Sequence, residues 1–184
     1  VAIMLPTGAA FFSAFYGVLY AGAVPVPIYP PTRPSQIEEH LKRQAGILRN
    51  AQAVLLIGAP EASAVARLLK LQVETLRAVV SVDELGQTPL TMPLKVEPRA
   101  TALLQYTSGS TGDPKGVVLS HANLLANIRA MGEAMEVGPT DVFVSWLPLY
   151  HDMGLIGAWL GSLYFAAPLV VMSPLTFLVR PEPW

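Results

Sequence analysis

Residues 1–28 read V-A-I-M-L-P-T-G-A-A-F-F-S-A-F-Y-G-V-L-Y-A-G-A-V-P-V-P-I, and this stretch decides the fold. Residues 1–5 are an apolar run of strand-forming residues, and residues 24–28 are a second one. Between them, large apolar side chains recur near helical spacing, after Thr7, which can cap a helix, and before Gly22, which can end one. A strand, a helix and a strand within this length predict a right-handed crossover unit.

The alternation of strands and helices continues beyond this unit. We expect a helix capped by Ser35, followed by a strand at residues 53–57. A helix at residues 61–71 and a strand at residues 78–82 come next. Residues 87–98 contain prolines and little periodicity, which indicates a connector. The pattern predicts an α/β fold, with mostly parallel sheet layers flanked by helices on both faces.

The second half of the chain begins with two strands around a glycine-rich segment. A strand at residues 101–106 leads into that segment, and a strand at residues 116–119 leaves it. Ser120 can cap the helix that follows. Further elements are expected at residues 141–147 (strand), 153–164 (helix) and 169–172 (strand). Met and Phe residues at helical spacing are predicted to be core, and His40 and His121 are assigned to surface or helix-start positions.

The composition excludes several classes of function. The 184 residues allow one domain with a sizeable core, and a net charge of −1 offers no basic stripe for nucleic acid. The chain has no cysteine, which excludes disulfides, thiolate metal sites and a cysteine nucleophile. That absence fits a reducing compartment, so a cytoplasmic location is expected.

Two long uncharged runs raise the question of a membrane span. Prolines interrupt both of them, at residues 1–32 and 153–179, so neither supplies the ~20 consecutive apolar helical residues that a span requires. No membrane span is therefore predicted. The chain also starts with Val1 inside a predicted strand and is 52% hydrophobic. We interpret these features as those of a piece cut from a larger body, although buried parallel strands are also apolar.

Residues 106–116 read Y-T-S-G-S-T-G-D-P-K-G, which is typical of a phosphate-binding loop. Gly109, Gly112 and Gly116 allow backbone amides to converge on an anion, and Lys115 adds a positive charge. Hydroxyl groups that can donate to phosphate oxygens come from Thr107, Ser108, Ser110 and Thr111. The Walker P-loop would need Gly-Lys-Ser/Thr where Pro114, Lys115 and Gly116 stand. The alternative is a flexible Ser/Gly hairpin or linker between the two strands. A linker would not need the Pro-Lys-Gly ending or an apolar strand on each side.

The same segment resembles the signature of the adenylate-forming superfamily, in which the loop holds the ATP β- and γ-phosphates while a carboxylate attacks the α-phosphorus. The resemblance implies an ATP site, with Mg²⁺ as the expected partner and Lys115 stabilising the departing pyrophosphate; the metal ligands stay unknown. The implied phosphate-loop positions are Thr107, Ser108, Gly109, Ser110, Thr111, Gly112 and Lys115.

Three further segments resemble the fatty acyl-AMP ligases within that superfamily. Residues 146–157 read W-L-P-L-Y-H-D-M-G-L-I-G, residues 172–181 read M-S-P-L-T-F-L-V-R-P, and residues 21–31 read A-G-A-V-P-V-P-I-Y-P-P. The resemblance implies that His151 lies beside the pocket for the acyl substrate. The alternative is a histidine at a strand end, with Asp152 capping the next helix.

The resemblance implies activation of a fatty acid to an acyl-adenylate, followed by transfer to a pantetheine thiol of an acyl carrier protein. A long- or medium-chain acyl-CoA synthetase, with CoA as acceptor, is the alternative within enzymes. A non-catalytic nucleotide-binding or interaction module is the alternative outside them. Residues 1–184 are expected to be a partial N-terminal AMP-binding domain, without the later adenine and ribose motifs and the small lysine-bearing domain. Little or no ligase activity is therefore predicted for these residues alone.

Overall fold

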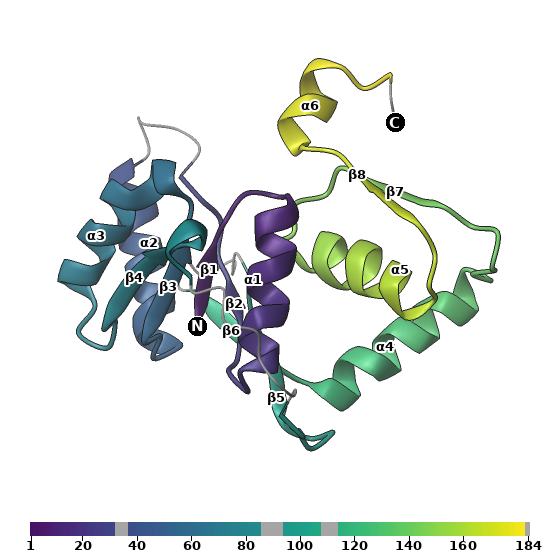
Figure 1. Ribbon diagram of the computed structural model, residues 1–184, viewed down its shortest axis with the longest axis horizontal. Coiled ribbons are helices and arrows are strands. Elements are labelled where there is room, and N and C mark those ends of the chain that lie inside the picture. The colour runs from purple at the N-terminus through teal and green to yellow at the C-terminus, as the bar shows by residue number, and fades with distance from the viewer. Residues whose placement is uncertain (32–36, 86–93, 108–113, 183–184) are drawn as a thin grey trace.

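The first sheet consists of four short strands in a computed structural model that describes residues 1–31, 37–85, 94–107 and 114–182 (Figure 1). Their order is β2-β1-β3-β4, and every neighbouring pair is parallel. The strands are β1 (Ala2–Met4), β2 (Val26–Pro27), β3 (Leu55–Gly58) and β4 (Ala78–Ser81). Helix α1 (Ala9–Tyr20) joins β1 to β2, so the predicted strand, helix and parallel strand are present.

Helices cover both faces of this sheet, as predicted. Helices α2 (Ile37–Asn50) and α3 (Ser63–Gln72) lie on one side and α1 on the other (Figure 1). Met4 joins the buried cluster of α2 and α3, whereas Ile3 joins the cluster that contains Phe11 and Phe15 of α1. Successive strand residues point to opposite faces, so a strand covered on both sides is apolar at every position. Two 3-10 turns complete this half, η2 (Pro60–Ala62) and η3 (Val82–Glu84).

Strands β5 (Thr101–Thr107) and β6 (Lys115–Ser120) form an antiparallel hairpin. The amide of Leu104 in β5 donates to the carbonyl of Pro25 at 3.1 Å, so the hairpin lies beside β2. Ser120 caps the next helix, α4 (His121–Ala134): its Oγ accepts from the Asn123 amide at 3.1 Å, and Asn123 Oδ1 accepts from the Ser120 amide at 3.0 Å. The predicted cap at Ser120 is therefore confirmed.

The C-terminal part contains a second, small parallel pair of strands and a π-helix. Strands β7 (Phe143–Ser145) and β8 (Leu169–Val171) pair in parallel, and α6 (Pro174–Val179) follows. Strand β7 is shorter than predicted at both ends: Gly138 and Asp141 form a turn before it, and Ser145 Oγ accepts from the Leu147 amide after it. The helix predicted at residues 153–164 is a π-helix, η4 (Met153–Leu160), continued by α5 (Gly161–Tyr164).

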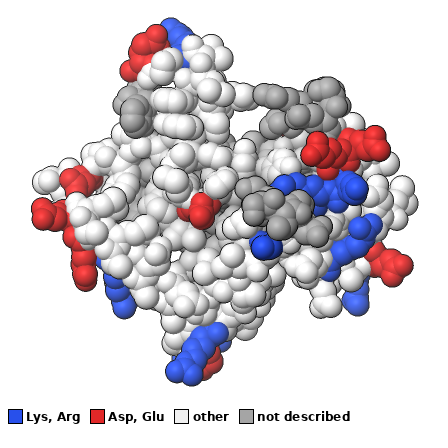
Figure 2. All heavy atoms as spheres, turned by 180° about the vertical axis from the view of Figure 1, so that it is seen from behind, with Lys and Arg blue, Asp and Glu red and all other residues white. Residues whose placement is uncertain are grey.

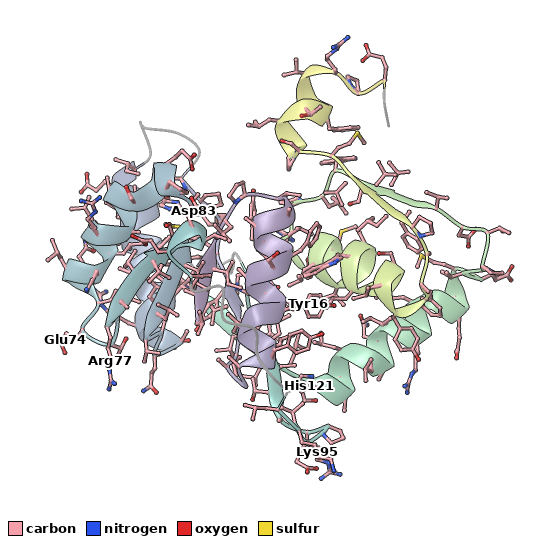
Figure 3. The ribbon with its side chains drawn as sticks, viewed as in Figure 1. Tyr16, Glu74, Arg77, Asp83, Lys95 and His121 are labelled. Carbon is pink, nitrogen blue, oxygen red and sulfur yellow. The ribbon has the colours of Figure 1, made fainter. Side chains whose placement is uncertain are left out.

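An aromatic cluster joins the first sheet and its helices to the C-terminal part of the chain. Trp159 of η4 packs against α1, with ring centroids 4.5 Å from Phe12, 5.3 Å from Phe15 and 5.2 Å from Tyr16. Tyr16 points from α1 toward η4 and α5 (Figure 3). Such aromatic pairs contribute roughly 0.5–1.5 kcal/mol each beyond the area that they bury. They fix the π-helix, and with it the segment before it, against the first sheet.

Three details of the sequence prediction are wrong. Thr7 does not cap α1, whose N-cap is Gly8; its Oγ1 accepts instead from the amide of Leu149 at 3.2 Å. His40 is buried rather than at the surface, because α2 turns it onto the ring of Tyr29, with centroids 4.9 Å apart. Met135, predicted to be core, is 56% exposed. The cap expected at Ser35 lies outside the described residues.

No helix in the described parts of the chain combines the length and the apolar character needed to cross a membrane.

Candidate functional site

The two ends of the predicted phosphate loop lie side by side at the tip of the hairpin. Thr107, the last residue of β5, is paired in register with Lys115, the first residue of β6, and both are exposed. The predicted phosphate-binding residues between them lie outside the described residues; these are Ser108, Gly109, Ser110, Thr111 and Gly112. The hairpin therefore brings one hydroxyl and one ammonium group to the same place.

Helix α2 contacts the loop end of this hairpin. The Arg43 guanidinium donates to the carbonyl of Thr107 at 3.4 Å, and the Tyr106 hydroxyl donates to Asn50 Oδ1 at 2.5 Å. A Cβ at position 116 would lie 2.9 Å from Cζ of Tyr106, so a larger residue there would have to displace the tyrosine ring. Burial raises the pKa of Tyr106, so its hydroxyl stays protonated as a donor. Lys and Arg side chains gather on the side that carries α2 and α3 (Figure 2).

The Y-H-D-M segment forms a tight turn between β7 and η4. The amide of His151 donates to the carbonyl of Pro148 at 3.1 Å, and the amide of Leu155 donates to the carbonyl of His151 at 2.8 Å. Gly154 is required here, because a Cβ would lie 2.3 Å from the Pro148 carbonyl oxygen. The chain thus folds back on itself too closely for any side chain at that position.

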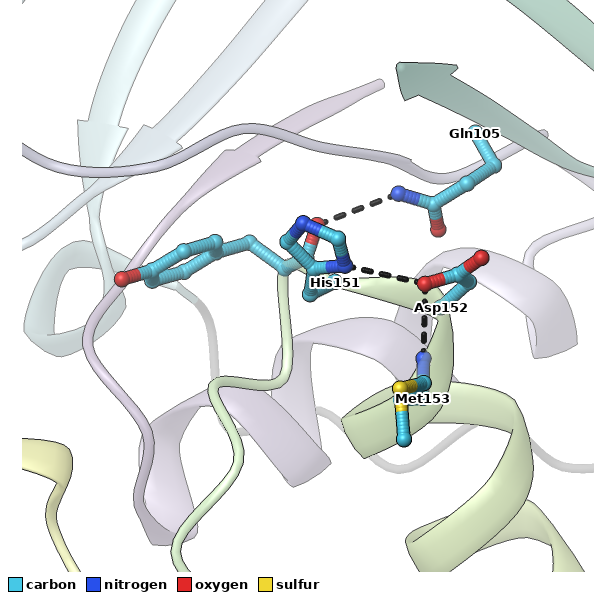
Figure 4. A network of polar contacts seen from close by, with 5 residues as sticks. Gln105, His151, Asp152 and Met153 are labelled. Atoms are coloured by element: carbon cyan, nitrogen blue, oxygen red, sulfur yellow. Dashed lines mark hydrogen bonds and ion pairs between the residues drawn. The ribbon is translucent and has the colours of Figure 1, made fainter. Parts of the chain in front are cut away.

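His151 and Asp152 interact with each other at the start of the π-helix (Figure 4). His151 Nδ1 lies 2.9 Å from Asp152 Oδ1, which also accepts from the amide of Met153 at 2.8 Å. The hydrogen bond from His151 is the main cause that lowers the pKa of Asp152; burial opposes it and the Met153 amide adds to it. Asp152 is the N-cap of η4, which confirms the capping role that was the alternative interpretation of this pair.

Gln105 is a site residue that the sequence prediction missed. Its Nε2 donates to the carbonyl of Tyr150 at 3.1 Å, so β5 is joined to the Y-H-D-M turn (Figure 4). The side chain is only 4% exposed, and its Oε1 has no hydrogen-bond partner among the described residues. The available signal was a polar residue inside the apolar strand T-A-L-L-Q-Y-T.

Two adjoining cavities open between the hairpin, α4 and η4. The first, of about 500 Å³, is lined by the polar side chains of Gln105, Thr107, Asn123, Asn127 and Asp152, together with apolar residues of β6. The second, of about 440 Å³, is mainly apolar; its lining includes Met131, Phe143, Val144, Met153 and Gly157. Asn127, Asp152 and Ile156 line both.

This arrangement places a cavity of mixed lining beside one that is almost wholly apolar. We call the first one the polar compartment or polar cavity, because it carries most of the polar side chains. The polar compartment contains Thr107 at the base of the predicted phosphate loop, and the apolar one follows the π-helix. Such a pair suits a ligand with a charged head and a hydrocarbon tail. His151 is absent from the described lining of both cavities, and its neighbour Asp152 is present in both. Within the described ranges, no three His, Asp or Glu side chains are grouped to hold a metal ion.

Comparison with known protein families matches residues 1–184 to the family described as AMP-binding enzyme. Among curated proteins, the putative fatty-acid–CoA ligase FadD21 of Mycobacterium tuberculosis (strain ATCC 25618 / H37Rv) is 37% identical over 191 residues, covering 99% of this chain and 32% of the relative. The medium-chain-fatty-acid–acyl-carrier-protein ligase JamA of Moorena producens (strain JHB) is 34% identical over 189 residues, covering 99% and 31%.

A solved structure agrees with these relatives. The crystal structure of a fatty acyl-adenylate ligase from L. pneumophila, in complex with acyl adenylate and pyrophosphate, superposes with a TM-score of 0.82 at 32% identity. The match covers all of this chain and 32% of that one. The chain thus spans about a third of the length of the proteins that it matches.

Proposed function

This chain belongs to the family of AMP-binding enzymes, and from that premise we propose that the whole protein uses ATP to activate a fatty acid as its acyl-adenylate. The observation that carries the proposal is the pair of adjoining cavities. Thr107 and Asp152 line the polar cavity, and Asp152 also lines the apolar one. A carboxylate at their junction would have its hydrocarbon chain in one cavity and ATP in the other.

In the proposed reaction, a carboxylate oxygen attacks the α-phosphorus of ATP and pyrophosphate leaves. The protein aligns the two reactants and neutralises the negative charge that develops on the phosphates. We assign the phosphate-holding role to Thr107 and Lys115, whose register places them together, and to the loop between them. Its proposed contacts come from Ser108, Gly109, Ser110, Thr111 and Gly112. Lys115 would stabilise the pyrophosphate through its charge.

Mg²⁺ is the cofactor that this chemistry implies. It usually takes most of its ligands from substrate phosphates and water, with only one or two carboxylates from the protein. The described residues offer no cage of carboxylates, which fits an ion that arrives bound to ATP. When bound, Mg²⁺ would supply further charge neutralisation on the phosphates.

We assign the fatty acyl chain to the apolar cavity along the π-helix. Its volume of about 440 Å³ falls in the range of ordinary ligand pockets, roughly 300–1,000 Å³. Gly157 widens the cavity, since a Cβ built there meets no atom within 4 Å. His151 stands at the mouth in this proposal: it is bonded to Asp152, which lines both cavities, and its side chain is 68% exposed.

We propose that the acyl group then passes to the pantetheine thiol of an acyl carrier protein. JamA, which is named for a carrier protein, supports this acceptor, whereas FadD21, which is named for CoA, supports the alternative. Incubating the full-length protein with a fatty acid and ATP, and with either a phosphopantetheinylated carrier or CoA, separates them. Acyl transfer to CoA alone would overturn the choice of a carrier.

ATP–pyrophosphate exchange with a panel of fatty acids tests the first step. The full-length protein is expected to exchange label only when a fatty acid is present. Binding of ATP without exchange under any acid would instead indicate a non-catalytic nucleotide-binding module. We further propose that residues 1–184 are part of a larger AMP-binding domain and give little exchange alone, which the chain's 32% share of FadD21 supports. Robust turnover by these residues would contradict that.

A further inference from the structure

We infer that Gln105 is a positioning residue, which keeps the phosphate-loop hairpin and the Tyr150–Asp152 turn in a fixed relation. The inference rests on the proposed function, because it concerns the site assigned to ATP and the acyl carboxylate. Gln105 stands two residues before Thr107 on β5. Its Nε2 crosses to the carbonyl of Tyr150, 45 residues away in the sequence, at 3.1 Å.

The environment of Gln105 argues against a role in packing alone. Its neighbours Ala102 and Leu103 on β5 are completely buried, and Gln105 itself is 4% exposed. A buried amide costs free energy unless its hydrogen bonds are made, and an apolar side chain of similar shape would avoid that cost. Among the described residues, Nε2 of Gln105 makes a hydrogen bond and Oε1 makes none. The single bond of Nε2 must therefore offset the cost of burying an unpaired Oε1.

The position of the hydrogen bond between Gln105 and Tyr150 explains why an amide is favoured at residue 105. Each of three successive residues in the turn is held by a different contact: Leu149 through Thr7, Tyr150 through Gln105, and His151 through Pro148. Of these, the Gln105 bond is the one that reaches the strand leading into the phosphate loop (Figure 4). Gln105 also lines the polar cavity between Thr107 and Asp152. A shift of the hairpin relative to the turn would therefore break this bond first.

A single positioning bond between two half-sites predicts a particular kinetic pattern. In the full-length protein, Gln105→Met should lower kcat/KM for ATP–pyrophosphate exchange by about tenfold, within the range for loss of one buried hydrogen bond. KM should rise for both ATP and the fatty acid, because both half-sites are displaced. Thr107→Val, in contrast, should raise KM for ATP alone. Gln44→Met is the matched control: Gln44 on α2 is buried like Gln105, but its amide has no hydrogen-bond partner among the described residues and it does not line the cavity.

A second variant separates the hydrogen bond from the shape of the side chain. Gln105→Glu keeps the shape, but its carboxyl donates to the Tyr150 carbonyl only when protonated. Its activity relative to wild type should therefore rise as pH falls, whereas the ratio for Gln105→Met should stay flat. Among the described residues, the titratable groups that face this site are His151 and Asp152. Gln105→Met keeps both of them and carries no titratable group at position 105, so its ratio to wild type is the reference for the pH dependence of Gln105→Glu.

Hydrogen exchange distinguishes failure of this inference from failure of the proposed function. In Gln105→Met, the amides of Leu149 and His151 should exchange at least several-fold faster, whatever the substrate is. Unchanged exchange at these amides, or KM values equal to those of Gln44→Met, would overturn the positioning role. If wild type shows no ATP–pyrophosphate exchange, but Gln105→Met still speeds hydrogen exchange at these two amides, the proposed function is overturned. The role of the Gln105 hydrogen bond then stands.

Discussion

Helices cover both faces of the sheet β1–β4, and we call this half of the molecule the closed half; strands of the half built on β5–β8 leave apolar side chains exposed, and we call it the open half. In the closed half, all three residues of β1 are buried, and helices cover both faces of the sheet. In the open half, apolar side chains of β6 and β7 face solvent; Val118 is 63% exposed and Val144 is 40% exposed. The cavities with Thr107 and Asp152 lie in the open half. In the proposed function, the closed half is the support and the open half presents the groups assigned to the chemistry.

The largest difference is expected in the free energy of unfolding. Leu56→Ala in β3 removes a completely buried side chain and should cost about 3 kcal/mol, through lost transfer energy and a cavity. Val118→Ala in β6, at a largely exposed position, should cost less than ~0.5 kcal/mol. Urea unfolding of both variants measures the contrast. Equal losses would mean that the two halves do not differ in this way.

Activity should show the opposite dependence on the two halves. Lys115→Ala, at the tip of the hairpin, should lower kcat/KM for ATP–pyrophosphate exchange by about 100-fold, as loss of a charge-stabilising group does elsewhere. Lys95→Ala removes an exposed lysine from the segment before β5 (Figure 3). Lys95 lines neither cavity, so the substitution should change the rate less than ~2-fold. The assay uses the full-length protein at saturating fatty acid. A drop of similar size in both variants would remove the assigned role of Lys115.

Two glycines on the π-helix allow a sharper test within the open half. Gly154→Ala places a Cβ against the Pro148 carbonyl and should destabilise by about 1–3 kcal/mol, like other over-packed sites. Gly157→Ala adds a Cβ in open space and should leave the unfolding free energy within ~0.5 kcal/mol.

Gly157 also tests the assignment of the acyl chain to the apolar cavity. Gly157→Leu projects into that cavity, so longer fatty acids should lose activity relative to shorter ones by tenfold or more. Exchange rates across a series of chain lengths measure the shift. An unchanged preference would place the acyl chain elsewhere.

The closed half was predictable from the sequence because its strands and helices depend on local sequence patterns. Continuous apolar runs and helical spacing are enough to place β1, α1 and β3, and helices on both faces follow from the parallel order. The burial of His40 was missed because its helix face is decided by contact with Tyr29, from another element.

The open half was predictable mainly at its motifs. The sequence pattern predicted its strands and the helix cap at Ser120. The pairing of Thr107 with Lys115 comes from the structure. The π-helix was not predicted, since 3.6-residue periodicity does not distinguish it from an α-helix over eight residues. Gln105 was missed because its importance depends on a partner 45 residues away.

The smallest expected difference concerns pH, where each half should lose stability in its own range. Burial lowers the pKa of His40 below its ordinary value of 6.5. The unfolded chain therefore binds the proton more readily, and stability is full above pH 6.5 and falls as the pH decreases toward the lowered pKa. His40→Leu should remove that decline, which urea midpoints at pH 7 and pH 5 would reveal. An unchanged slope would mean that His40 does not set the stability of the closed half in this range.

Asp152 should act in the same direction at lower pH. Its hydrogen bond with His151 lowers its pKa below the ordinary value of 3.8, so the stability that it contributes is present above pH 3.8 and is lost as the pH falls through the lowered pKa. Its side chain is 57% exposed, and solvent screening makes this contribution smaller than that of His40. Asp152→Asn keeps an oxygen for the helix cap but cannot titrate, so its urea midpoint should change less than wild type between pH 5 and pH 3. If both substitutions altered the same pH range, the assignment of the two declines to His40 and Asp152 would be wrong.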